Sequence, residues 1–270
     1  MTHRRIISNF LLLFIGLLLS CPFVISAFQR SHYAFAALDR QGCQTIPKMP
    51  TAALKLATKD SEGTNQQEIQ FVTNTWCPFA QKAWIALEAS HCQYKMREVS
   101  LYGAGGKPDW FWELNPKGTV PVVVVKEGDK KIVLDDSEYI LEAVMDGRIK
   151  GDGRMLIDME RDEEVRQITQ WRNIISKQLI PIGKAAVLGG SRTKLQSLLK
   201  ELDSMVIGPY LTGEKFTVAD AAAFPFFWRL DKEYGLGKDG TQKLHAWLER
   251  CLQDEAVRKT ITSQGWWWWW

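Results

Sequence analysis

The sequence predicts two successive folded domains, an α/β domain followed by an all-helical one. The first observation is an order of strand, helix and strand, then helix, strand, strand and helix, between residues 66 and 147. The second is a group of three glycines, Gly147, Gly151 and Gly153, which indicates a linker. The third is a series of helical patterns over residues 151–262.

An N-terminal extension carries the positive charge of this 270-residue chain. Residues 1–65 hold seven Lys or Arg side chains and three acidic ones, so the net charge of +3 arises here. The charge excess therefore gives no reason to expect a nucleic-acid-binding surface. The overall composition, 46% hydrophobic and 24% charged, is typical of a soluble globular protein.

The extension has the pattern of targeting segments. Residues 1–27 predict a signal peptide, with Arg4 and Arg5, an apolar run too short to favour a membrane span, and a small-x-small motif ending at Ala27. Residues 28–65 predict a transit-like presequence and a linker. A signal peptide followed by a transit-like segment whose first residue is Phe28 resembles the bipartite presequences of algae with secondary plastids of red-algal origin. This resemblance implies a plastid destination, and the ER or secretory lumen is the alternative.

The predicted elements of the first domain follow from local patterns. Alternating or β-branched runs predict strands, and apolar side chains at helical spacing predict helices. Strands are expected at residues 68–73, 94–99, 120–125 and 131–134, and helices at residues 78–89, 108–114 and 136–145. Because two strands joined through a helix require a right-handed crossover, this order is that of the thioredoxin fold.

The second domain reads as helices throughout. They are expected at residues 157–180, 193–207, 221–230, 244–252 and near Ala256. We expect Pro181 to stop the first helix and Pro225 to kink the third. Thr217 and Asp220 match a capping box at the start of the third helix, so Asp220 is expected to be structural. The Trp-rich tail, residues 263–270, has no physical explanation.

Cys77 is the candidate nucleophile. It lies between the first strand and a helix opened by Pro78, a residue suited to a first helical turn. A cysteine at a helix N-terminus has a pKa lowered from about 8.5 to roughly 3.5–7.5, which favours the thiolate. Ala80 occupies the second position of a Cys-x-x-Cys pair. The sequence therefore predicts monothiol exchange, with glutathione supplying the second sulfur.

Four motifs in order resemble a known family. They are Cys77-Pro-Phe-Ala80, Lys107-Pro-Asp-Trp-Phe111, Asn115-Pro-Lys-Gly-Thr-Val-Pro-Val122 and Asp136-Ser137. The chain resembles glutathione transferases with a catalytic cysteine, namely the omega and lambda classes and the dehydroascorbate reductases. The resemblance runs from about Ile69 to about Ala256, and it implies a thioredoxin-like domain followed by an all-helical C-terminal domain.

The resemblance also implies a glutathione site. It assigns catalysis to Cys77 and glutathione binding to six residues: Phe79, Lys107, Val120, Pro121, Asp136 and Ser137. Pro121 corresponds to a cis-proline of the family, beside which the Val120 backbone would pair with glutathione. Plain helix capping is the alternative role for Asp136 and Ser137. Trp171, Phe227 and Trp228 are candidates for an acceptor site, although helical aromatic residues more often form a core.

The sequence thus predicts a glutathione-dependent thiol transferase that forms a Cys77–glutathione mixed disulfide. Dehydroascorbate reduction, glutathione conjugation and a non-enzymatic carrier of glutathione conjugates are the alternatives. Glutathione is expected as a co-substrate, and its small-molecule or protein conjugates as partners. No metal site or nucleic-acid partner is expected, and the chain is expected to be a monomer or a homodimer.

Overall fold

The computed structural model describes residues 67–101 and 106–261. The expected signal peptide, transit-like presequence and Trp-rich tail lie outside these residues. The described residues confirm the predicted fold class, a mixed sheet with helices followed by a helical domain. None of the described helices is long and apolar enough to cross a membrane.

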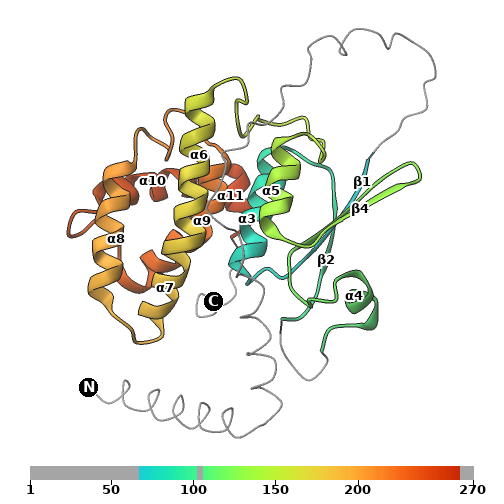
Figure 1. The fold of residues 1–270 in the computed structure, drawn as a ribbon, viewed down its shortest axis with the longest axis horizontal. Helices are drawn as coiled ribbons and strands as arrows, with labels where there is room; N and C mark the ends of the chain where they lie inside the picture. Colours follow the sequence, from blue (N-terminus) through green and yellow to red (C-terminus); the bar gives the residue numbers. More distant parts are fainter. Residues whose placement is uncertain (1–66, 102–105, 262–270) are drawn as a thin grey trace, which may run out of the picture. The chain divides into compact units, whose positions relative to one another are not determined.

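The first domain is built on a four-stranded sheet (Figure 1). The strands are β1 (Glu68–Thr73), β2 (Lys95–Glu98), β3 (Val122–Glu127) and β4 (Lys130–Leu134). Their order is β2-β1-β3-β4, in which β1 runs parallel to β2 and antiparallel to β3, and β3 runs antiparallel to β4. This is the thioredoxin topology, as predicted.

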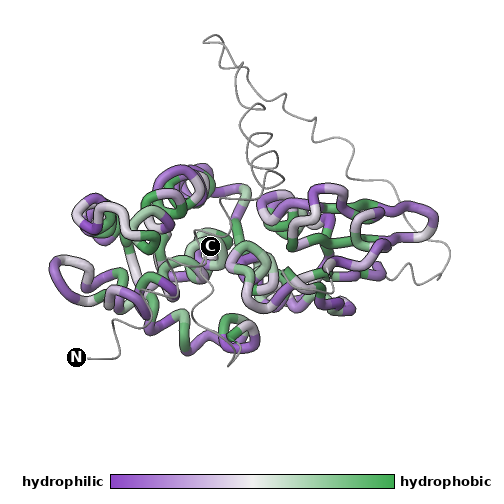
Figure 2. Tube along the Cα trace, turned by 90° about the horizontal axis from the view of Figure 1, so that it is seen from below, coloured by the Kyte–Doolittle hydropathy of each residue, from purple (hydrophilic) through white to green (hydrophobic). Residues whose placement is uncertain are grey.

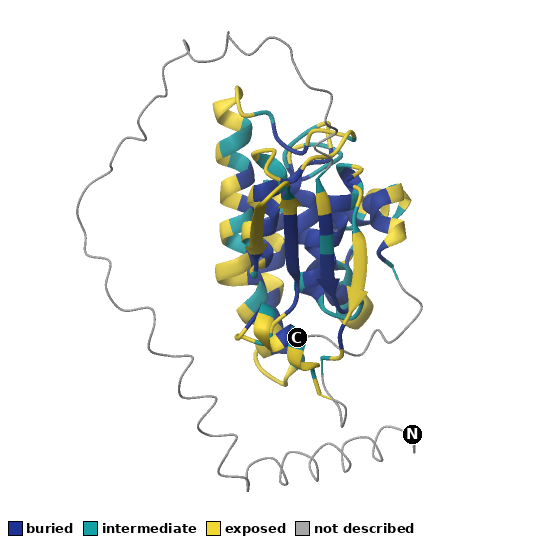
Figure 3. Ribbon diagram, turned by 90° about the vertical axis from the view of Figure 1, so that its right-hand side faces the viewer, coloured by how far each residue is buried: buried dark blue, intermediate teal, exposed yellow. Residues whose placement is uncertain are grey.

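Helices pack on both faces of the sheet. They are α3 (Pro78–Ala89), α4 (Asp109–Leu114) and α5 (Ser137–Met145). Side chains such as Phe71 and Val123 pack with α3 and α5 on one face, whereas Val72 and Val122 pack with Phe111 of α4 on the other. The central strands are therefore buried, while most of each edge strand is exposed (Figure 3).

The second domain is helical throughout its regular structure. Its elements are α6 (Asp162–Ile174), the π-helical turn η3 (Ile175–Leu179), α7 (Ile180–Val187), α8 (Arg192–Met205), α9 (Val218–Tyr234), α10 (Gln242–Gln253) and α11 (Glu255–Lys259). Twelve of the 17 residues of α9 are buried, which makes it the central helix of the domain. Figure 2 shows hydrophobic residues gathered where the helices face one another.

Two features of the first long helix differ from the prediction. The helix begins at Asp162 instead of residue 157. Leu156 and Ile157 are buried in a non-helical segment before it, and the Leu156 carbonyl accepts a hydrogen bond from the Val218 N–H. Pro181 does not stop it either. A proline has no N–H to donate within a helix, and here the chain continues through Pro181 with a π-helical turn directly before it.

Candidate active site

The sheet register brings the predicted site residues to one end of the sheet. Val72, near the end of β1, pairs with Val122 at the start of β3, and Val123 pairs with Leu134 at the end of β4. Therefore the turn after β1, the segment before β3 and the segment after β4 emerge at the same edge. These three segments contain Cys77, Val120-Pro121 and Asp136-Ser137.

The turn that carries Cys77 is held by the buried side chain of Asn74. Its amide donates to the Val99 carbonyl at 2.9 Å, and its carbonyl oxygen accepts from the Trp76 N–H at 3.0 Å. The Cys77 N–H donates to the Asn74 carbonyl at 3.0 Å. Short polar side chains often form such local bonds where a strand leads into a turn. Cys77 is thereby fixed as the N-cap of α3.

The Cys77 sulfur lies beside the segment that precedes β3. Its S–H donates to the Val120 carbonyl oxygen, 3.7 Å from the sulfur, and the Val120–Pro121 bond is cis, as expected. Both Cys77 and Val120 belong to one apolar cluster on the α4 side of the sheet. The Cys77 sulfur and the Val120 backbone are therefore adjacent, and the side chain of Val120 is buried.

The pKa of Cys77 is shifted in the direction opposite to the sequence-based expectation. Burial raises the pKa of the Cys77 thiol above its ordinary value. The N–H groups of Ala80 and Phe79 lower this pKa, but by less than burial raises it. Arg229 and Lys82 also lower it through their positive charges. The helix N-terminus acts in the predicted direction, and the loss of water around the half-buried sulfur outweighs it.

The other predicted glutathione residues have varied surroundings. Asp136 is exposed and caps α5, accepting from the Glu138 N–H at 2.7 Å, and Ser137 is the buried first residue of that helix. Phe79 is half-buried and meets Phe226 edge to face, with ring centroids 5.3 Å apart. Lys107 is half-buried, and its ammonium donates to the Leu101 carbonyl at 3.1 Å. The capping role foreseen for Asp136 is thus present.

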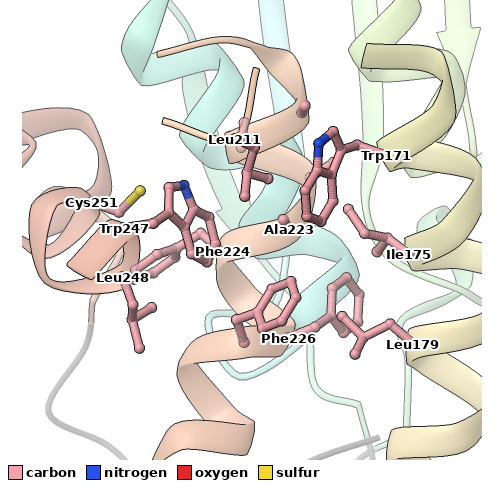
Figure 4. Packing of buried hydrophobic residues seen from close by; sticks show 14 of the residues in the cluster. Trp171, Ile175, Leu179, Leu211, Ala223, Phe224, Phe226, Trp247, Leu248 and Cys251 are labelled. Carbon is pink, nitrogen blue, oxygen red and sulfur yellow. The ribbon is translucent and has the colours of Figure 1, made fainter. Parts of the chain in front are cut away.

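Two of the three residues expected at the acceptor site lie in the hydrophobic core. Trp171 is 2% exposed and packs with Ile175, Leu179 and Ala223 in the core of the helical domain (Figure 4). Phe227 is fully buried against Trp247. Trp228 alone is half-buried. Trp171 and Phe227 therefore serve as core residues, the alternative that the sequence had left open for them.

A charge cluster joins α3, α5 and α6. Glu138, which follows Ser137, pairs with the ammonium of Lys82 on α3. Its other oxygen accepts from Nε and Nη2 of Arg172 on α6 at 3.0 and 2.6 Å. Although burial raises the pKa of Glu138, the charges of Lys82 and Arg172 outweigh burial and lower it. The helical domain is thereby tied to the start of α5.

We expect a Glu138→Gln substitution to destabilise the protein by about 2 kcal/mol at neutral pH, because it leaves the buried Lys82 ammonium without its carboxylate. The folded-state pKa of Glu138 is depressed, so its contribution is full above about pH 5 and is lost as the pH falls through the folded pKa. Denaturant unfolding at several pH values measures this. Glu142→Gln, on the same helix and more exposed, is the control. Equal losses for both variants would contradict the expectation.

The sequence analysis missed Arg229, a buried residue of α9. Its guanidinium bonds to the turn that holds Cys77. A signal was present, because a single arginine stands inside the apolar run of residues 221–230. Lys82, Arg172 and Glu138 carried no comparable signal, since charged residues at helical spacing usually face solvent.

Comparison with known proteins gives two family matches. The model described as "Glutathione S-transferase, N-terminal domain" matches residues 76–146, and that described as "Glutathione S-transferase, C-terminal domain" matches residues 167–250. Together they cover more than half of the chain. The fold and the motifs described above lie largely within these two regions.

Curated relatives show low identity over most of the chain. Glutathione S-transferase omega-1 of Sus scrofa is 25% identical over 203 residues, covering 70% of this chain and 78% of the relative. Probable glutathione S-transferase DHAR1, cytosolic, of Oryza sativa subsp. japonica is 28% identical over 204 residues, covering 70% and 88%. Probable glutathione S-transferase DHAR2, chloroplastic, of the same plant is 24% identical over 201 residues, covering 70% and 69%.

Solved structures share the fold. Glutathione transferase Omega 1C from Trametes versicolor aligns with a TM-score of 0.64 at 23% identity, over 73% of this chain and 92% of that one. A glutathione transferase family member from Pseudomonas fluorescens, with two glutathione bound, aligns with a TM-score of 0.59 at 22% identity, over 71% and 91%.

Proposed function

The chain belongs to the glutathione S-transferase family, and from this premise we propose that it is a glutathione-dependent thiol transferase with Cys77 as its nucleophile. The observation that carries the proposal is the position of Cys77. It caps α3 beside the Val120 carbonyl, at the edge where the proposed binding segments meet. Because Ala80 offers no second thiol, glutathione itself supplies the resolving sulfur.

The reaction proceeds by two thiol–disulfide exchanges. The Cys77 thiolate attacks the glutathione sulfur of a mixed disulfide, forming a Cys77–glutathione disulfide and releasing the substrate sulfur as a thiolate, which takes up a proton. The thiolate of a second glutathione then attacks the glutathione sulfur of that disulfide. Oxidised glutathione leaves, and the Cys77 thiolate returns.

The binding residues are proposed from the family resemblance and, for Val120, Asp136 and Ser137, also from their position at one sheet edge. The Val120 backbone beside Cys77 would pair with the cysteinyl backbone of glutathione in the manner of an added strand. Asp136 would take the ligand's ammonium, and the N-terminus of α5 at Ser137 would take its γ-glutamyl carboxylate. Lys107 would meet the glycyl carboxylate after leaving its bond to the Leu101 carbonyl, and Phe79 would border the sulfur.

Turnover of a glutathione mixed disulfide tests this function. The assay couples release of oxidised glutathione to glutathione reductase and follows NADPH consumption. A protein that binds glutathione but gives no turnover would instead be a carrier. Dehydroascorbate is the second substrate to assay, because the four sequence motifs also resemble those of the dehydroascorbate reductases.

We also propose that the protein acts in a plastid, supported by the presequence resemblance. A fluorescent protein fused behind the full chain should enter the plastid of an alga with a secondary plastid. Fusion of residues 1–27 alone should reach only the ER, because the transit-like segment is missing. A full-length fusion that remains in the ER would contradict this proposal and favour the secretory lumen.

A further inference from the structure

Arg229 is a buried cation at the Cys77 turn. Its side chain comes from α9, and its Nη2 donates to the Trp76 carbonyl at 3.1 Å, next to the nucleophile in sequence. Its Nη1 donates to Gln81 Oε1 on α3 at 2.7 Å and to the Pro225 carbonyl at 2.8 Å. Arg229 therefore clamps both sides of Cys77, the turn before it and the first helical turn after it.

The guanidinium has no carboxylate partner among the residues that the structure describes. All three recorded acceptors are neutral. Burying a charge without a counter-charge is costly, and burial lowers the pKa of Arg229 to about 10. The group nevertheless stays protonated at neutral pH. A buried guanidinium without a counter-charge would be stabilised by a nearby group that becomes negatively charged when it loses its proton.

Cys77 is the group that can supply this anion. Besides the backbone, two charged side chains act on its sulfur, Arg229 from α9 and Lys82 from its own helix. Lys82 is already paired with Glu138, so its charge is largely balanced. Burial lowers the pKa of Arg229, and the charge of Cys77 opposes this by raising it. The remaining unbalanced charge belongs to Arg229.

We propose that Arg229 is the positioning residue of Cys77, fixing its turn through the Trp76 carbonyl and balancing the charge of the thiolate. This inference deepens the proposed function, since it concerns the same sulfur. It also gives the helical domain a part in the chemistry of the first domain. While Cys77 is a neutral thiol, the guanidinium has only neutral partners among the described residues, three hydrogen-bond acceptors and the ring of Trp228. It gains a counter-charge whenever Cys77 ionises or leaves a mixed disulfide as a thiolate.

The test is the pH dependence of iodoacetamide alkylation at Cys77, measured on the full chain by mass spectrometry of the Cys77 peptide. Arg229→Gln removes the charge and keeps donors. We expect it to raise the pKa of Cys77 by about one unit and to slow alkylation near neutral pH about tenfold. The limiting rate at high pH should stay unchanged. Arg229→Lys should restore most of the difference, because it restores the charge.

Arg154→Gln is the matched control. It removes another arginine charge, one that is paired with the Asp254 carboxylate and does not contact the Cys77 turn. The pKa of Cys77 in this variant should equal that in the wild-type protein. An equal shift in this control, or no shift in a folded Arg229→Gln protein, would overturn the proposal.

If Arg229→Gln does not fold, the Arg229→Lys variant tests the charge role by itself. A pKa of Cys77 within about 0.3 unit of the wild type supports the charge role, whereas a rise of about one unit overturns it. Alkylation uses no glutathione. A protein that shows the shift but never turns over glutathione disulfides would therefore contradict the proposed function alone, and leave the role of Arg229 intact.

Discussion

Replacing Cys77 with serine is expected to reduce turnover of glutathione mixed disulfides by on the order of 1,000-fold or more. A serine hydroxyl does not ionise in the working range and cannot form a disulfide. Unlike Cys77, the other two described thiols are buried in the cores, and burial raises the pKa of Cys92 to about 12 and that of Cys251 well above its ordinary value, so we expect neither to replace Cys77. The coupled reductase assay measures the loss.

Cys92→Ser is the matched control for that experiment. Cys92 is buried under the other face of the first domain, in the cluster with Phe71 and Trp84, so its loss should leave turnover near the wild-type value. Both variants should be compared after thermal unfolding has shown that they are folded. A Cys77→Ser protein that keeps its turnover would mean that another sulfur carries the reaction.

Replacing Asp220 with alanine is expected to lower the free energy of unfolding by about 3–5 kcal/mol. Asp220 is fully buried. Its Oδ1 accepts from the Leu211 N–H at 2.9 Å and the Trp247 indole at 2.8 Å, and its Oδ2 from the Thr217 N–H at 2.7 Å. Alanine leaves these buried donors without partners. Denaturant unfolding gives the loss directly.

Thr217→Ser serves as the comparison. It keeps the hydroxyl that donates to Asp220 Oδ2 at 3.0 Å and should change the stability by less than about 1 kcal/mol. The confirmed capping box at this helix start explains why Asp220 belongs to stability and not to catalysis. An Asp220→Ala protein within about 1 kcal/mol of the wild type would refute this assignment.

The elements of the first domain could be predicted because their signals are local. The strand 68–73, the helix opened by Pro78 and the capped helix after Asp136 all depend on neighbours a few residues away. The capping box of Thr217 and Asp220 is local in the same sense. The position of Cys77 at a helix N-terminus follows from two adjacent residues, and so it too was available from the sequence.

Long-range contacts decided the rest. The burial of Trp171 and Phe227 depends on which helix faces are covered, and aromatic residues at helical spacing look alike in either case. The helical chain continues past Pro181 after a π-helical turn, and no local sequence pattern predicts that turn.

Cys77 shows most clearly which properties follow from local sequence and which follow from long-range contacts. The sequence by itself determined the fold class and the turn that presents the thiol, because both follow from residues adjacent along the chain. Only the tertiary structure decided the state of that thiol. Burial raises its pKa, and one of the two cations that oppose burial, Arg229, reaches Trp76 across 153 residues of sequence. Desolvation and charge act through space, so spacing along the chain does not reveal them.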